Sequence, residues 1–235
     1  MTHGPSPRGV LEVPRRGVAL TRRWAFVTIG LAAGFSGLAV ITTILTGIPL
    51  LLVEAAMVLI PLTFVIVVVR RTPRPIVLEV WRVVRVGLLA GFAASVVYDA
   101  ARTVLSILDP SPYNPFEAIR LFGLGMVGTD AAPALVFGAG FVIHFLNGTT
   151  FGVIYAIFAG RHVRTLRVAL VGGMAWGLTL EFIQSILYPG WLGIPNVVLD
   201  EFLVISGLGH LAYGATLGLG VRRLLSRKVN DGGAA

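Results

Sequence analysis

The stretch HFLNGTTFG, residues 144–152, indicates an internal repeat, because HLAYGATLG at residues 210–218 has its histidine and both glycines at the same spacing. Each stretch lies within a long apolar segment. The segment before each one also matches, since an acid falls eight residues after a glycine in both, Asp99 in the first and Glu181 in the second. The pattern predicts a duplicated two-helix unit with an acid on one helix and a histidine on the other. Ionisable side chains are costly inside a bilayer, so this pattern marks a candidate site.

Composition indicates an integral membrane protein. Of 235 residues, 56% are hydrophobic and 13% are charged, and the mean hydropathy is +0.87, far from the values of a soluble domain. Six apolar stretches are long enough to cross the bilayer as helices of about 20 residues. We expect these spans at 24–46, 48–69, 83–107, 135–159, 168–188 and 198–219. The predicted fold is an all-α polytopic membrane helix bundle of six transmembrane helices, arranged as two-helix parallel repeats.

The predicted domain organisation is simple. Residues 1–20 form a basic cytoplasmic arm, rich in Pro, Gly and Arg, which we expect to be disordered. Residues 21–225 form the six-helix transmembrane domain, and residues 226–235 form a cytoplasmic tail. The first hairpin is interpreted as a degenerate copy of the repeat, because Glu54 on its second span has no histidine and glycine pattern around it.

The distribution of charge predicts the orientation and argues against nucleic-acid binding. Seventeen of the 19 Lys and Arg residues fall in segments that a six-span chain places on one side of the membrane. By the positive-inside rule, that side and both termini are cytoplasmic. Topology and contact with anionic lipid therefore account for the net charge of +8 without nucleic acid. Cysteine is absent, which excludes disulfides and thiolate chemistry.

Two shorter segments are expected to lie at the membrane surface. Residues 116–127 are apolar but too short to span, which predicts an interfacial or re-entrant helix in the loop between the third and fourth spans. Residues 76–85 follow a Pro-containing break and are expected to form a short amphipathic segment on the cytoplasmic surface.

Helical spacing places the polar residues of the last four spans on interior faces. At about 1.5 Å of rise per residue, the two acids and the two histidines lie at similar depths in the outer half of the membrane. Small residues share these faces and allow close helix approach. The predicted ligand-binding residues are His144, Asn147, Tyr155, Gln184, His210 and Tyr213.

Several chemistries are compatible with this set. His144, His210 and Glu181 could serve as ligands of a divalent metal such as zinc, iron or manganese, although no helix has metal-ligand spacing. Imidazole and carboxylate could instead exchange protons during transport. In an enzyme, Asp99 and Glu181 would be the catalytic acids, with Tyr98 and other aromatics as walls that stabilise a cation.

Structural interpretations compete with these. Asp99 and Arg102 can form a self-neutralising pair three residues apart. Ser206 lies on the same helix as His210 but outside any nucleophile motif, so it is interpreted as a packing residue.

The last four spans resemble the YagU-like family of small bacterial inner-membrane proteins. The motifs are Gly-Leu-x-Ala-Gly at 87–91, a histidine-bearing helix ending in Tyr and basic residues, a Gly-rich helix ending before a Pro loop, and Gly-His-Leu-x-Tyr at 209–213. The resemblance implies a helical fold and a bacterial plasma membrane location, and implies no activity. The acids Asp99 and Glu181 are not part of the resemblance.

Three functions remain open from the sequence. The first is binding or transport of a small molecule or ion, with proton coupling as one form. The second is a membrane-embedded enzyme that acts on a lipid or isoprenoid-like substrate. The third is a non-catalytic subunit of a larger membrane complex. The expected partners are membrane lipids, the ligand itself and either a second copy or a complex partner.

Overall fold

The computed structural model describes residues 15–108, 114–192 and 199–226, and the elements found there are all helices. Six of them are long and apolar enough to span a membrane. The prediction of an all-helical, multi-pass membrane protein is therefore confirmed at this level. The elements are α1 (Arg15–Thr46), α2 (Leu50–Arg71), α3 (Arg74–Leu108), α4 (Glu117–Val127), α5 (Pro133–Phe158), the 3₁₀ turn η1 (Gly160–His162), α6 (Leu166–Leu192) and α7 (Leu199–Ser226).

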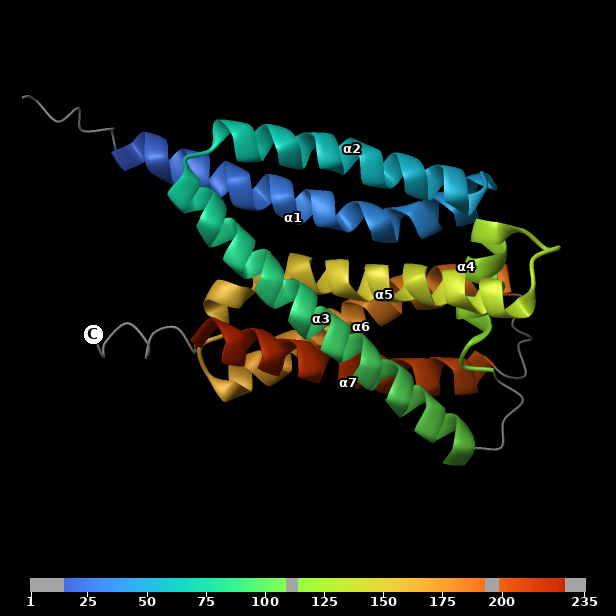
Figure 1. The fold of residues 1–235 in the computed structure, drawn as a ribbon. Helices are drawn as coiled ribbons and strands as arrows, with labels where there is room; N and C mark the ends of the chain where they lie inside the picture. The colour runs from blue at the N-terminus through green and yellow to red at the C-terminus, as the bar shows by residue number, and fades with distance from the viewer. Residues whose placement is uncertain (1–14, 109–113, 193–198, 227–235) are drawn as a thin grey trace, which may run out of the picture.

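α1 and α2 form a hairpin along one side of the bundle (Figure 1). The turn between them contains Gly47 at φ +71°, a backbone conformation that glycine adopts without steric cost. α1 begins at Arg15, so the last six residues of the expected arm, 15–20, are helical. The remainder of the arm, residues 1–14, and the tail from residue 227 lie outside the described residues.

α3 corrects one prediction. The expected surface segment at 76–85 is not separate, because it is the start of one continuous helix of 35 residues. The Pro-containing break lies where it was expected, since α2 ends at Arg71 and α3 begins at Arg74. Pro75 is in the first turn of α3, where the missing N–H costs no helical hydrogen bond, and no later proline interrupts the helix. This extension brings Glu79 to Arg22 of α1, with which it forms an exposed ion pair. α3 then crosses the bundle diagonally (Figure 1).

α4 is a helix of 11 residues where the sequence predicts a short one. It packs against α5 and buries Ile119 and Phe122. α4 lies at the end of the bundle opposite to the start of α1 and the end of α7 (Figure 1). α6 continues to Leu192, four residues beyond the predicted end of the fifth span.

Glycines allow two helix pairs to pack backbone to backbone. In the first pair, a Cβ added to Gly91 of α3 would lie 2.7 Å from the carbonyl oxygen of Gly148 on α5. In the second pair, a Cβ on Gly214 of α7 would lie 2.9 Å from the Cα of Met174 on α6. Side chains at these positions would force the helices apart, because such contacts are shorter than van der Waals distance.

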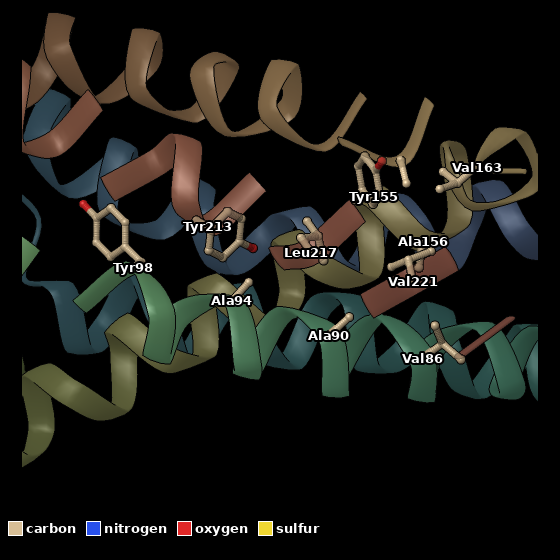
Figure 2. Packing of buried hydrophobic residues seen from close by; sticks show 11 residues of the cluster. Val86, Ala90, Ala94, Tyr98, Tyr155, Ala156, Val163, Tyr213, Leu217 and Val221 are labelled. Atoms are coloured by element: carbon tan, nitrogen blue, oxygen red, sulfur yellow. The ribbon is translucent and has the colours of Figure 1, made fainter. Parts of the chain in front are cut away.

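α3 and α7 join the two pairs through the largest buried cluster. Figure 2 shows Ala94, Ala90 and Val86 of α3 in a row that faces Tyr213, Leu217 and Val221 of α7. Small residues on α3 opposite large ones on α7 give the interdigitation expected of a packed core. By contrast, α5 and α6 do not pack closely along their length. A cavity lies between them.

Candidate functional site

The cavity has a volume of about 540 Å³ and is bordered by α1, α3, α4, α5, α6 and α7. This volume is within the usual range for a small-molecule site, about 300–1,000 Å³. Most of its wall is apolar, and the polar side chains are concentrated around α3, α5 and α7. The polar residues that line it are Ser95, Tyr98, Arg102, His144, Asn147, Gln184, His210 and Tyr213.

The first acid–histidine pair joins α3 and α5. His144 Nε2 lies 3.0 Å from Asp99 Oδ2. Arg102 Nη2 donates to the other oxygen, Asp99 Oδ1, at 3.2 Å, and the Arg102 side chain is only 3% exposed. Because an ionised Asp99 only accepts hydrogen bonds, Nε2 carries the ring hydrogen and the neutral form of His144 has its acceptor at Nδ1. No described residue bonds His144 Nδ1.

The second pair joins α6 and α7. His210 Nδ1 lies 2.7 Å from Glu181 Oε2 and 3.0 Å from the backbone oxygen of Ser206. Since a carbonyl oxygen only accepts, Nδ1 carries the ring hydrogen and Nε2 is the acceptor in the neutral ring. The two histidines therefore use opposite nitrogens toward their acids. Each has one ring nitrogen without a partner among the described residues.

A serine and a glutamine hold Glu181 in place. Ser206 Oγ donates to Glu181 Oε2 at 2.7 Å, and Gln184 Nε2 donates to Ser206 Oγ at 2.7 Å. Ser206 is fully buried. The interpretation of Ser206 as a packing residue is therefore incomplete, because its hydroxyl bonds the acid of the second pair. A hydrogen-bonded neighbour at position 206 could have been suspected from its helical spacing to His210, four residues further along.

Tyr98 packs near a histidine of each pair. Its ring centroid is 5.9 Å from that of His144 and 4.7 Å from that of His210. The Arg102 guanidinium covers the Tyr98 ring at 4.3 Å, a cation–π contact. The sequence placed Tyr98 among the aromatic walls, and in the structure its ring packs near both imidazoles.

The pairing of the histidines bears on the predicted metal site. Glu181 and His210 are in contact, but His144 is paired with Asp99. Within residues 15–108, 114–192 and 199–226, no three His, Asp or Glu side chains come together in an arrangement that holds a metal ion. The structure therefore does not gather His144, His210 and Glu181 around one metal ion.

The remaining predicted site residues differ in position. Asn147, Gln184 and Tyr213 line the cavity, and Tyr213 Oη donates to the backbone oxygen of Gly148 at 2.7 Å. Tyr155 does not line it, because its ring is buried in the hydrophobic cluster and packs on Trp176 at 6.3 Å. Asp99 and Glu181 do not line the cavity either. Each acid is within ion-pair distance of a histidine that does.

α1 supplies a wall that the sequence did not predict. Gly30, Gly34 and Gly37 of α1 border the cavity opposite aromatic and aliphatic side chains of α5. Their spacing of three and four residues is a helical face of small residues.

Comparison of the chain with protein-family models, with curated proteins and with solved structures found no match.

Proposed function

We propose that this integral membrane protein binds a small amphipathic molecule in the intramembrane cavity. The observation that supports this best is the division of the cavity wall into a long apolar part and one polar end built on two acid–histidine pairs. An apolar wall gives an inorganic ion no ligands, so a molecule with an apolar tail and a polar head is the better match.

The ligand enters from the bilayer. Three cavity-lining side chains in the middle of their spans are exposed, Leu31 at 60%, Leu38 at 47% and Ile183 at 41%. At that depth an exposed side chain faces acyl chains rather than water, so the cavity opens sideways between α1 and α6. Ile119 and Phe122 of α4 are buried in the cavity wall and close its end toward the loops. α4 serves in this proposal as an interfacial or re-entrant cover.

The head group of the ligand carries a hydrogen-bond donor, such as a hydroxyl. The unpartnered nitrogens of His144 and His210 accept a hydrogen bond in their neutral forms, and both residues line the cavity. Long-chain alcohols and similar lipids combine this donor with the apolar tail that the cavity wall requires.

Filling part of the cavity should weaken ligand binding. A Cβ added to Gly34 meets only Ile154 Cδ1, at 3.7 Å, so Gly34→Leu extends into the cavity without disturbing the backbone. We expect photolabelling of the protein in lipid nanodiscs by a diazirine-bearing long-chain alcohol to fall about tenfold, since the added side chain occupies the tail site. Mass spectrometry of the labelled peptides measures this.

The matched control is Gly138→Leu, because Gly138 is exposed on α5 and an added Cβ meets nothing within 4 Å. Equal labelling of the two variants, or labelling of wild-type protein confined to residues outside the cavity wall, would refute the proposed binding site.

An enzyme that acts on such a lipid is the second candidate. The specific support is the orientation of both imidazoles by acids, which presents a basic nitrogen for proton transfer. In that case the histidines are the catalytic residues, and Asp99 and Glu181 position them. Conversion of the labelled alcohol by purified protein, lost in His144→Ala and His210→Ala, would distinguish an enzyme from a binding protein.

The two helix pairs are, in this proposal, copies of one parallel repeat. Support comes from three matched features, namely the glycine crossing, the acid–histidine contact across it and the order of the two helices. Equivalent substitutions in the two copies should then change ligand binding by similar factors.

Both termini are proposed to lie in the cytoplasm of a bacterial cell, with the protein in the plasma membrane. α1 begins and α7 ends at one end of the bundle (Figure 1), and Arg70, Arg71 and Arg223 lie in the last turns of α2 and α7. A reporter enzyme that is active only outside the cytoplasm should be inactive when fused after Ser226 and active when fused after Gly128. The reverse pattern would invert the topology.

A further inference from the structure

A second polar cluster lies outside the acid–histidine pairs, where α1, α2 and α5 meet. Ser36 Oγ is 2.6 Å from Asn147 Oδ1 and 3.3 Å from Glu54 Oε1. All three side chains are buried, Glu54 at 5% exposure. Glu54 Oε2 is also buried and has no hydrogen-bond partner among the described residues.

No cation pairs with Glu54 among the side chains that the structure describes. The ionisable side chains on the helices around it are engaged elsewhere: Arg22 of α1 pairs with Glu79, Arg120 of α4 pairs with Glu117, and His144 of α5 pairs with Asp99. Arg23, Arg70 and Arg71 lie toward the opposite ends of α1 and α2, more than three helical turns from Ser36 and Glu54. In such a place, burial costs an ionised carboxylate more free energy than a protonated one.

The number of hydrogens in the cluster restricts how it can be bonded. The Ser36 hydroxyl has one hydrogen and cannot donate it to Glu54 and Asn147 together. When Glu54 carries a proton, Glu54 donates to Ser36, and Ser36 donates to the amide oxygen of Asn147. When Glu54 is ionised, Ser36 donates to Glu54, and the Asn147 amide must turn over so that its NH₂ donates to Ser36.

Asn147 also lines the main cavity, and its amide nitrogen bonds none of the described residues. The end of the amide that does not bond Ser36 is therefore available to a ligand. When Glu54 is protonated, Asn147 presents its N–H donors to the cavity. When Glu54 is ionised, Asn147 presents its carbonyl acceptor instead.

We propose that Glu54, Ser36 and Asn147 form a proton-binding site whose occupancy sets whether Asn147 presents a donor or an acceptor to the cavity. This inference rests on the proposed binding function for its effect on ligands. The proton site itself is independent of that function. The preferred ligand therefore depends on pH. Protonated Glu54 favours a head group that accepts a hydrogen bond, and ionised Glu54 favours one that donates.

The proton site can be tested without a ligand. N,N′-Dicyclohexylcarbodiimide is a lipophilic reagent that adds to protonated carboxyl groups. Glu54 borders a hollow on the membrane-facing side of α2, with Leu51, Val58 and Met126, through which the reagent can reach it. We expect modification of Glu54 that declines as pH rises, in wild-type protein and in Ser36→Ala, and none at this position in Glu54→Gln. Absence of modification at every pH would overturn the proton site.

The coupling is tested with two photoreactive probes in nanodiscs, a long-chain alcohol and a long-chain methyl ester whose head only accepts hydrogen bonds. One hydrogen bond of about 0.5–1.5 kcal/mol corresponds to a change of about two- to tenfold. In wild-type protein, the ester-to-alcohol labelling ratio should fall by this factor as pH rises. Ser36→Ala should show no change in the ratio, because it removes the hydroxyl that connects Glu54 to Asn147. Glu54→Gln should keep the low-pH ratio at every pH, because glutamine donates to Ser36 as the protonated acid does.

Thr63→Ala and Glu117→Gln are the matched controls. Thr63 is a lipid-facing hydroxyl on α2, and Glu117 is a carboxylate on α4 paired with Arg120. Both should retain the wild-type pH response. A response that persists in Ser36→Ala would overturn the coupling. If neither probe labels the cavity of wild-type protein at any pH, the binding function and the coupling are both refuted. The proton site is then tested by the carbodiimide experiment alone.

Discussion

Replacement of Arg102 by methionine is expected to lower the free energy of unfolding by about 3–5 kcal/mol, the usual effect of breaking a buried ion pair. The Arg102 side chain is 3% exposed, bonds Asp99 at 3.2 Å and covers the Tyr98 ring at 4.3 Å. Methionine keeps much of the side-chain volume but leaves the Asp99 carboxylate, only 15% exposed, without its cation. Equilibrium unfolding in mixed micelles, with increasing fractions of a denaturing detergent, measures the change.

Two further variants separate the charge effect from packing. The double variant Asp99→Asn/Arg102→Met removes both charges and should recover most of the loss, because no charge is then left unpaired. Arg22→Met breaks the exposed pair with Glu79, whose side chains are 50% and 42% exposed, and should cost no more than about 1 kcal/mol. If Arg102→Met loses no more stability than Arg22→Met, then Arg102 and Asp99 are not a stabilising pair.

The sequence was a sufficient guide to the helices for a simple physical reason. A bilayer requires about 20 apolar residues for each span and allows no unsatisfied backbone, so length and composition alone predict the spans. The errors occur at the ends. Residues 76–85 were expected to form a segment separate from the third span, but they are the first turns of α3, which has no proline after Pro75 to interrupt it.

Depth and helical face predicted that the acids and the histidines share one level of the bundle interior. Both quantities are local, since they depend only on the position of Asp99, His144, Glu181 and His210 within their own spans. The contacts of Asp99 with His144 and of Glu181 with His210 agree with that reasoning.

The parts that sequence reasoning missed depend on how the helices rotate against one another. Ser36 and Asn147 are 111 residues apart in the chain, and nothing local indicates their contact. The glycine face of α1 was visible in the sequence, but small residues are also typical of plain helix packing. Tyr155 shares a helical face with His144, yet its depth places it in the hydrophobic cluster instead of the cavity.

Removal of both histidines should have the largest effect on ligand binding. We expect His144→Leu/His210→Leu to reduce labelling by the photoreactive long-chain alcohol by up to about a hundredfold, because two hydrogen bonds of about 0.5–1.5 kcal/mol each are lost. Each single variant should lose up to about tenfold. Photolabelling in nanodiscs, corrected for the folded fraction, measures all three.

The pattern of the variants distinguishes a hydrogen-bonding role from a structural one. His210→Gln retains an acceptor in the cavity and should recover part of the binding that His210→Leu loses. His162→Leu alters a histidine in η1, outside the cavity wall, and should leave labelling unchanged. If the two helix pairs are copies of one unit, the single variants at 144 and 210 should agree within a few-fold, and a large difference would mean that only one pair contacts the ligand. Full labelling of the double variant would contradict any role for the imidazoles in holding the head group, because nothing else at that end of the cavity provides two oriented ring acceptors among the residues described.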